Sequence, residues 1–257
     1  MNLKIAIVGA GNVASFFAKK FAAAGFTIVS IHSKNLAHAE SLASEVQAIA
    51  SNTLSTIGSD FDYLFFAVSD DALKACVAEV PASNNFCWLH TSGAMSKEIF
   101  AEKTNRYGVF YPLQTFTKSV ALSQSVFPVL IESSSEEIQQ ALEKLAAQIQ
   151  LPFQYADSDQ RKNIHLAAVF ACNFSNHLYQ IASDILAEQH LPFELLLPLI
   201  QETVAKLNHL SPSAAQTGPA IRNDQAVISA HIALLKEHPQ WAMVYKLLSA
   251  EIQKSKQ

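Results

Sequence analysis

The sequence contains few cysteines and no long apolar run. Its three cysteines, Cys76, Cys87 and Cys172, are isolated, with no pair at redox or metal-ligand spacing. This pattern argues against a disulfide scaffold and favours a reducing compartment. The longest apolar stretches, such as residues 166–172 and 195–200, are far too short to cross a bilayer, and the N-terminus lacks a basic segment followed by a cleavage site. We therefore expect a cytoplasmic protein that does not contact membranes.

Strong charge of either sign is also missing. The formal net charge is -4, and no long basic run marks a surface for nucleic acid, so we expect no nucleic-acid partner. Half of the 257 residues are hydrophobic and only 16% are charged. This balance excludes disorder as the main state and provides a core for one large domain or two modest ones.

The first half of the chain alternates strand-like and helix-like segments. Strands are predicted at residues 3–8, 26–31, 63–68 and 86–89, and helices at 12–24, 37–46 and 70–79. Further strands at 107–111 and 127–131 and a helix at 136–150 extend the pattern. Strands that alternate with helices indicate βαβ units and a parallel sheet that is buried on both faces.

The second half has a different texture. After Ala156 strand patterns disappear, and helices are predicted at residues 159–188, 193–210, 224–237 and 241–253. Residues 211–222, which include Pro212, Gly218 and Pro219, are predicted to form a loop. We therefore place a domain boundary near residue 156, between an α/β domain (1–156) and an all-helical domain (157–257).

A glycine motif lies between the first predicted strand and the first predicted helix. It reads Gly9-Ala-Gly-Asn-Val-Ala14. Gly9 permits a tight turn, and Gly11 lets the backbone approach a diphosphate held by free N–H groups at the helix N-terminus. Asn12 and Val13 belong to the same predicted contact. The alternative is a glycine-rich turn without a ligand, but the strand–turn–helix context favours a Rossmann-type dinucleotide-binding domain, that is, a doubly wound sheet.

The end of the second predicted strand bears on the choice of cofactor. A domain specific for NAD carries an acid about twenty residues after the glycine motif, where it holds the ribose 2′-hydroxyl. Here the strand ends in His32, Ser33 and Lys34, and no acid precedes Glu40. Ser33 and Lys34 are suited to a 2′-phosphate, so NADP(H) is favoured over NAD(H), although Lys34 is also compatible with an ordinary solvent-exposed turn.

Polar residues follow two more predicted strands. Val68, Ser69 and Asp70 follow one strand, and Thr91 and Ser92 follow another. Because ligands bind beyond the carboxyl ends of strands in open α/β sheets, these residues are predicted to contact the cofactor. The alternative for Ser69 and Ser92 is a turn or helix-capping role.

Nearly the full chain resembles a bacterial branch of Rossmann-like NADP oxidoreductases that carry a C-terminal domain of unknown function. The resemblance rests on the glycine motif and on residues 67–70, 90–93, 111–116, 165–173 and 218–224. The branch is related to pyrroline-5-carboxylate reductase, the β-hydroxyacid dehydrogenases and the deazaflavin-dependent NADP reductases. It implies a 6-phosphogluconate-dehydrogenase-like helical domain, dimerisation through that domain, and an active cleft between domains. The family pattern implies a His before Pro-Leu-Gln-Thr-Phe, but this sequence has Tyr111 at that position. This departure argues against a catalytic role for Tyr111.

Two polar residues stand out on an apolar segment of the helical half. His165 and Asn173 flank residues 166–172, and a histidine on an apolar helix is more often a core residue than a catalyst. The resemblance implies that this helix supplies the polar group facing nicotinamide, commonly Lys with a nearby Asn. An imidazole can donate a proton as a carbonyl or imine accepts hydride. The two residues are eight positions apart, about 80° around an α-helix, so they share a face only loosely.

Arg222 and Asp224 complete the candidate site. Asp224 is predicted to cap the following helix, and Arg222 is suited to holding a substrate carboxylate; the alternative is a local Arg222–Asp224 ion pair. No metal site is predicted, because Asn173 and His177 have no acidic or cysteine companion. Ser92 lacks the nucleophile-elbow motif of a hydrolase.

Two functions are compatible with these residues. The first is an NADP(H)-dependent oxidoreductase that transfers hydride to or from a small carbonyl, imine or hydroxy acid, and that forms a homodimer. The second is a dinucleotide-binding sensor or regulator without turnover, which the lack of a catalytic Lys on the helix of His165 keeps open.

Overall fold

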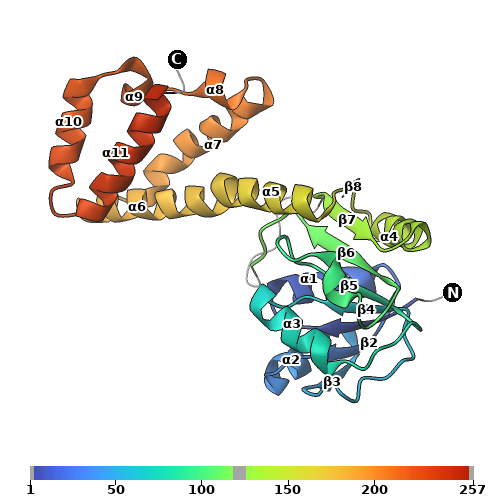
Figure 1. Cartoon of the computed structure of the whole chain (residues 1–257). Coiled ribbons are helices and arrows are strands. Elements are labelled where there is room, and N and C mark those ends of the chain that lie inside the picture. The colour runs from blue at the N-terminus through green and yellow to red at the C-terminus, as the bar shows by residue number, and fades with distance from the viewer. Residues whose placement is uncertain (1–2, 118–125, 255–257) are drawn as a thin grey trace. The chain divides into compact units, whose positions relative to one another are not determined.

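A computed structural model of the chain describes residues 3–117 and 126–254, which divide into two units, Met1–Cys172 and Asn173–Gln257 (Figure 1). The first unit contains one sheet in the order β3-β2-β1-β4-β5-β6-β7-β8. Its strands are β1 (Lys4–Val8), β2 (Thr27–His32), β3 (Ile49–Ser51), β4 (Tyr63–Phe66), β5 (Cys87–His90), β6 (Tyr107–Pro112), β7 (Val129–Ser133) and β8 (Phe153–Tyr155). The strand order reverses at β1, which pairs in parallel with both β2 and β4. The predicted Rossmann-type sheet is therefore confirmed.

The sheet is not wholly parallel, however. Strand β7 runs antiparallel to β6, with Phe110 opposite Ile131. A parallel pairing requires a crossover connection, usually a helix, and no helix is described between β6 and β7. The expectation of a parallel sheet was therefore wrong for the β6–β7 pair.

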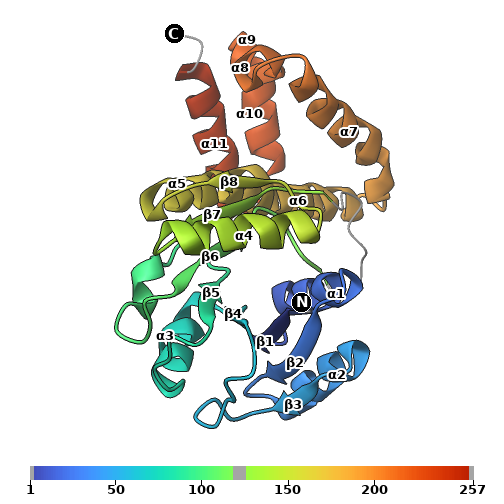
Figure 2. The same ribbon diagram turned by 90° about the vertical axis from the view of Figure 1, so that its right-hand side faces the viewer.

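Helices cover both faces of the sheet. They are α1 (Asn12–Ala23), α2 (Leu36–Val46), α3 (Asp70–Glu79), the 3₁₀ turn η1 (Lys97–Phe100) and α4 (Glu136–Gln148). Figure 2 shows α1 and α2 on one side of the central strands and α3 on the other. The alternation of each strand creates two cores: Phe65 packs with the α1 side, whereas Leu64 and Phe66 pack with the α3 side. Each fully buried Phe stabilises the fold by about 1.5–3 kcal/mol relative to exposure.

Helix α5 (Ser158–Ala168) is fixed to the sheet by a buried ion pair. The guanidinium of Arg161 is fully buried; its Nη1 donates to Glu132 on β7 and its Nη2 donates to the carbonyl oxygen of Met95, 2.5 Å away. Lys97 donates to the other carboxylate oxygen of Glu132 at 3.0 Å. Burial alone would raise the pKa of Glu132, but the hydrogen bonds from Arg161 and Lys97 outweigh it and lower that pKa. The carboxylate therefore stays ionised, and the first turn of α5 is held in place.

The second unit is helical, as predicted, although its details differ. Its helices are α6 (Ser175–Ala187), η3 (Phe193–Leu196), α7 (Leu197–Ala205), η4 (Lys206–Asn208), α8 (Pro212–Ala215), α9 (Pro219–Arg222), α10 (Gln225–Leu234) and α11 (Pro239–Lys254). The predicted loop 211–222 was wrong, because Pro212 and Pro219 each begin a short helix at the position where proline costs least. The predicted continuous α-helix 159–188 is interrupted by a π-helical turn, η2 (Val169–Phe174).

No described helix combines the length and apolar character that a membrane span needs. Within residues 3–117 and 126–254, no group of three or more His, Cys, Asp or Glu side chains is placed to hold a metal ion.

Candidate cofactor and proton-transfer site

The turn after β1 depends on the absence of a side chain at position 9. Gly9 has a φ of 122°, which favours glycine, and a Cβ there would lie 2.2 Å from the carbonyl oxygen of Ala67. The amide of Gly9 donates to the carbonyl oxygen of His32 at 2.7 Å. The turn is thus packed against β4 and tied to the end of β2.

Gly11 has the opposite surroundings. It is the N-cap residue of α1, its backbone is extended, and no described protein atom lies within 4 Å of where a Cβ would stand. The first N–H groups of α1 have no partner within the helix and carry its partial positive charge. A diphosphate fits this open space, because anions are stabilised at a helix N-terminus.

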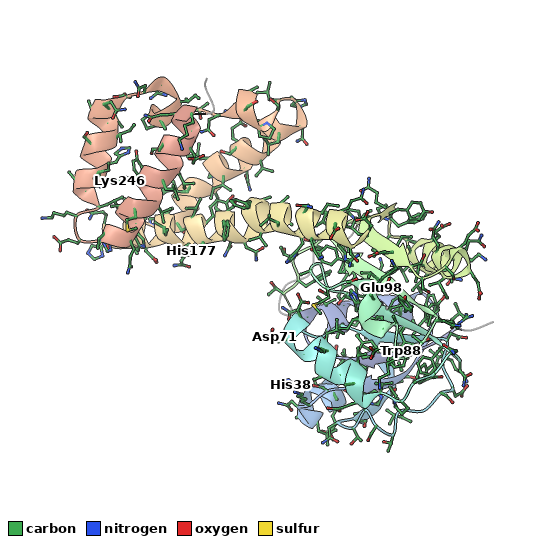
Figure 3. All side chains as sticks on the ribbon, in the orientation of Figure 1. His38, Asp71, Trp88, Glu98, His177 and Lys246 are labelled. Atoms are coloured by element: carbon green, nitrogen blue, oxygen red, sulfur yellow. The ribbon has the colours of Figure 1, made fainter. Side chains whose placement is uncertain are left out.

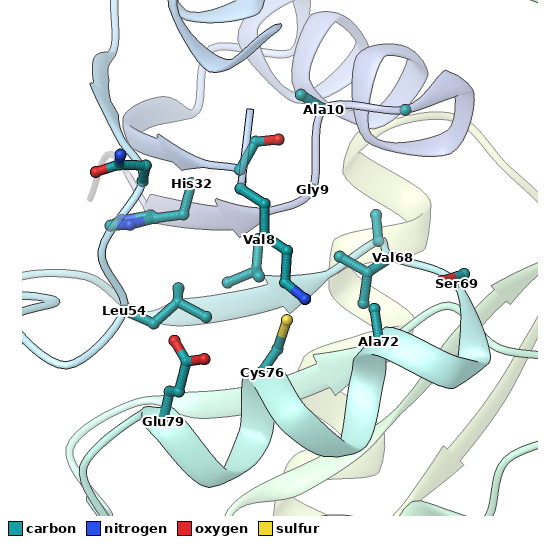
Figure 4. Close-up of a pocket in the computed structure, with 15 residues that line it drawn as sticks. Val8, Gly9, Ala10, His32, Leu54, Val68, Ser69, Ala72, Cys76 and Glu79 are labelled. Atoms are coloured by element: carbon teal, nitrogen blue, oxygen red, sulfur yellow. The ribbon is translucent and has the colours of Figure 1, made fainter. Parts of the chain in front are cut away.

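A cavity of about 300 Å³ adjoins the turn (Figure 4). It is lined by Val8, Gly9, Ala10, Gly11, His32, Ser33, Lys34, Asn52, Leu54, Ala67, Val68, Ser69, Ala72, Cys76 and Glu79. Seven of the predicted cofactor residues are among them: Gly9, Gly11, His32, Ser33, Lys34, Val68 and Ser69. Lining residues that follow β3 (Asn52 and Leu54) or lie on α3 (Cys76 and Glu79) were missed, because they belong to no sequence motif.

His32 lines the cavity as a neutral ring. Its Nδ1 lies 3.0 Å from the carbonyl oxygen of Thr53 and its Nε2 lies 2.9 Å from Oγ of Ser30. This arrangement requires Nδ1–H to donate to the carbonyl and Nε2 to accept from the hydroxyl. Burial lowers the pKa of His32, and the hydrogen bond to Thr53 opposes this only in part. His32 therefore presents no positive charge to a phosphate.

The other predicted cofactor residues lie outside the lining of this cavity. Asn12 donates from Nδ2 to the carbonyl oxygen of Phe116 at 2.7 Å, and Val13 packs against the core. Asp70 is exposed in the first turn of α3. Thr91 donates through its amide to the carbonyl oxygen of Phe66 at 3.1 Å. Ser92 accepts hydrogen bonds from the amides of the two following turn residues, Ala94 and Met95 (3.1 and 2.9 Å), as its alternative turn role requires.

His90, at the end of β5, stabilises that turn. Its Nδ1 accepts from the amide of Ser92 at 3.1 Å, and the ring is fully buried. Burial, with the nearby charge of Arg161, lowers the pKa of His90 to about 3. This neutral ring helps to set the path of the backbone from Ser92 to Gly93.

His165 packs directly on Gly93. A Cβ at Gly93 would lie 2.7 Å from Cγ and 2.8 Å from Nδ1 of the His165 ring. The hydroxyl of Tyr111, near the end of β6, lies 3.0 Å from Nδ1 of His165. The histidine singled out on the sequence is thus half-buried beside the carboxyl ends of β5 and β6, and it contacts a tyrosine that is 54 positions away.

The remaining candidates belong to the second unit. Asn173 is exposed and lies within η2, where the i→i+5 bonding means that the α-helical angle assumed from the sequence does not apply. Arg222 is exposed at the end of α9. Asp224 caps α10 by accepting from the amide of Val227 at 3.3 Å, as predicted. Arg222 and Asp224 form no ion pair in the described part of the chain.

Comparisons with known proteins agree with this geometry. Residues 4–86 match the profile of the NADP oxidoreductases described as coenzyme F420-dependent, and residues 127–252 match a domain of unknown function, DUF2520. A candidate NADP oxidoreductase from Bacteroides fragilis is 36% identical, with a TM-score of 0.91 over 98% of both chains. The chain belongs to this family of NADP oxidoreductases. NADP(H) is accordingly its cofactor, and the predicted resemblance is confirmed.

More distant structures share the fold of this oxidoreductase. A reductive aminase from Aspergillus terreus, in complex with NADPH and ethyl-5-oxohexanoate, is 16% identical with a TM-score of 0.76 over 99% of this chain and 94% of that chain. A 1-pyrroline-5-carboxylate reductase from Streptococcus pyogenes is 10% identical with a TM-score of 0.64 over 98% of both chains. No curated protein matches the chain.

Two glycine variants of the oxidoreductase separate folding from cofactor binding. Gly9→Ala forces a Cβ onto a backbone carbonyl at positive φ, so we expect a loss of about 3 kcal/mol or more in the free energy of unfolding. Gly11→Ala meets no protein atom, so its stability should stay within about 0.5 kcal/mol of wild type. Because the new methyl group enters the diphosphate space, the Kd for NADPH should rise about tenfold or more. Urea unfolding and calorimetric titration measure both; wild-type affinity in Gly11→Ala would contradict the assigned diphosphate position.

Proposed function

We propose that this protein is an NADP(H)-dependent oxidoreductase in which His165 donates a proton to a small carbonyl or imine substrate, or removes one from a hydroxy acid. The observation that carries the proposal is the position of the His165 imidazole, which packs on Gly93 just after the end of β5. A proton donor there stands at the same sheet edge as the phosphate turn, which follows β1.

The strand order supports this assignment. In a doubly wound sheet the dinucleotide lies across the point where strand order reverses, with its two halves on opposite sides. One side here is formed by β2 and β3, whose ends carry Lys34 and Asn52. The adenosine half is therefore assigned to that side. The nicotinamide half is assigned to the β4–β5 side, where Ser69, Thr91 and His165 lie.

Lys34 is the residue to which we assign recognition of the 2′-phosphate. It lines the cavity together with Ser33, and its side chain is exposed enough to move. The neighbouring His32 is neutral and has both ring nitrogens occupied, so it contributes no charge. We therefore assign the contacts to the 2′-phosphate to the Lys34 ammonium and the Ser33 hydroxyl.

Bound NADPH supplies the hydride in this proposal, and the protein supplies orientation and a proton. We retain residues 157–257 as the substrate and dimerisation domain, with Asn173 as a polar contact to the substrate. Arg222 is exposed, and among the ion pairs of the described residues none joins it to Asp224, so we propose its guanidinium as the group that holds an anionic part of the substrate.

We also propose a homodimer in the cytoplasm. In the described part of Asn173–Gln257 only Ala220 and Ile228 are buried apolar residues, too few for a core that would hold helices together. Many large apolar side chains there are exposed: Phe174, Leu178, Ile185, Leu191, Leu195, Leu197, Leu199, Val204, Leu207, Leu210, Leu234, Met243, Leu247 and Leu248. A second copy of the same unit is the partner that we assign to this surface.

The free cysteines Cys76, Cys87 and Cys172 favour the reducing compartment.

Replacing Lys34 tests the preference for NADP(H). We expect Lys34→Ala to raise the Kd for NADPH about tenfold or more, because a charge-assisted hydrogen bond to the 2′-phosphate is lost. The Kd for NADH should change by less than about twofold. Lys74→Ala removes an exposed lysine of α3 outside the cavity lining and serves as the control. Equal losses for NADPH and NADH would show that Lys34 does not read the 2′-phosphate.

Turnover decides between an enzyme and a sensor. NADPH consumption is followed against a panel of small imines, keto acids and simple ketones. His165→Ala should lower kcat about a hundredfold or more with an unchanged Kd for NADPH, because it removes the proton donor. His177→Ala, on α6 in Figure 3, removes an exposed histidine and should have no effect. Tight NADPH binding without consumption across the panel would favour a sensor.

Sedimentation equilibrium tests the dimer. The wild type should have twice the chain mass of 28.1 kDa. Met243 and Leu247 are 70% and 64% exposed on α11, so Met243→Glu/Leu247→Glu should dissociate the dimer by placing charge in an apolar contact. Lys246→Glu, which alters an exposed charge on the same helix, should remain dimeric. A wild type that sediments as a monomer at micromolar concentration would contradict the assignment.

A further inference from the structure

The hydroxyl of Tyr111 is the one polar partner that the described structure gives to the His165 ring. Oη lies 3.0 Å from Nδ1, the ring centroids are 5.9 Å apart, and the rings are nearly perpendicular at 85°. Gly93 packs against Cγ and Nδ1 of the same imidazole. Within residues 3–117 and 126–254, no hydrogen bond is formed by Nε2. Orientation of the ring is therefore set by Gly93 and Tyr111, and Nε2 is the nitrogen left for a ligand.

The chemistry of the pair indicates the direction of the hydrogen bond. Burial raises the pKa of Tyr111, with Arg161 opposing the change and Asp70 and Cys172 adding to it, so the phenol stays protonated near neutral pH. A phenol is a good donor, whereas its oxygen is a weaker acceptor than an imidazole nitrogen. The O–H of Tyr111 therefore donates to the lone pair of Nδ1, and a neutral ring carries its proton on Nε2.

The neighbouring ionisable groups do not compete for the hydrogen bond between Tyr111 and His165. Arg161, one turn before His165 on α5, is committed to Glu132 and to the carbonyl oxygen of Met95. Asp70 is exposed in the first turn of α3, and Cys172 is exposed in η2. Of the groups that interact with Tyr111, none forms a hydrogen bond with His165 in the described structure. The tyrosine hydroxyl lies at Nδ1, where a hydrolase triad has a carboxylate, but as a donor it selects the opposite tautomer of the neutral ring.

We propose that Tyr111 is the positioning residue of this site, fixing the ring orientation and the tautomer of His165 so that Nε2 exchanges the proton with the substrate. The inference rests on the proposed function of His165, and it gives a positioning role to a residue whose departure from the sequence pattern argues against a catalytic one.

In the direction of reduction, the proton moves from Nε2 of His165 to the substrate. The Nε2–H bond of the protonated imidazole breaks, and its electron pair stays on nitrogen. A new O–H or N–H bond forms on the substrate atom that gains electrons as hydride arrives at the adjacent carbon. The imidazolium becomes a neutral imidazole that keeps its proton on Nδ1, and Nε2 takes a proton from water before the next turnover. A hydroxyl can serve each of these states, because Oη accepts from Nδ1–H of the charged ring and of the ring just after the transfer, and donates to Nδ1 of the resting neutral ring whose proton lies on Nε2.

Nitrogen-15 NMR of the ligand-free protein tests the inference without any substrate. In histidine-labelled wild type, the neutral ring of His165 should show Nδ1 unprotonated and Nε2 protonated, the signals being assigned by their loss in His165→Ala. Tyr111→Phe removes only the hydroxyl, so the ring should become a mixture of tautomers. Tyr107→Phe is the matched control, because it removes a hydroxyl from the same strand whose partner is Glu98. A wild type with the proton on Nδ1, or an unchanged tautomer in Tyr111→Phe, overturns the inference.

Steady-state kinetics with a substrate from the panel provides a second test of the role of Tyr111. Tyr111→Phe should lower kcat about tenfold, as the loss of one hydrogen bond implies, while KM for NADPH and the circular dichroism spectrum stay as in wild type. Tyr107→Phe should keep the wild-type kcat. Unchanged turnover in His165→Ala would defeat the proposed function, whereas unchanged turnover in Tyr111→Phe with impaired His165→Ala would defeat only the role of the tyrosine.

Discussion

The close approach of the β1–α1 turn to β4 constrains the rest of the first unit. Gly9 brings its backbone against the carbonyl oxygen of Ala67, where no side chain fits. The chain can then leave β1 into α1 on one face of the sheet, while α3 covers the other face. Because β1 has parallel partners on both sides, these departures open the crevice in which a dinucleotide binds. The same glycine turn therefore defines the topology and leaves the N-terminus of α1 open to an anion.

A second constraint fixes the helix that carries His165. A buried ion pair is weak grounds for stability, because desolvation offsets much of the attraction. Its effect on position is firmer: Arg161 can satisfy Glu132 and the carbonyl of Met95 only when the first turn of α5 lies against β7 and the loop beyond β5. His165 follows Arg161 by one turn and meets Gly93 on that same loop. The polar anchor thus helps to place the imidazole of His165 against Gly93.

Sequence patterns were sufficient for the parts of this fold that local rules determine. The strand–glycine–helix motif, the acidic start of α3 and the cap at Asp224 are each encoded within a few residues. Strands β3 and β8 have three residues each, too few for an alternating pattern, and a π-helical turn leaves no mark on apolar spacing. The contact between Tyr111 and His165 joins positions 54 apart, and the fit of an imidazole onto Gly93 depends on an absent side chain. Neither follows from any pattern along the chain.

Three histidines illustrate why residue type alone could not identify the site. His32 uses both ring nitrogens in internal hydrogen bonds, and burial lowers its pKa. His90 is fully buried with a pKa of about 3, so it stays neutral and serves its own turn. His165 is half-buried, with Nδ1 held by a neutral hydroxyl and Nε2 free of described partners. Both ring nitrogens of His32 are committed to internal partners and the ring of His90 is fully buried, whereas the described structure gives His165 a partner at Nδ1 alone. The distinction is geometric, and it singles out His165 among the three.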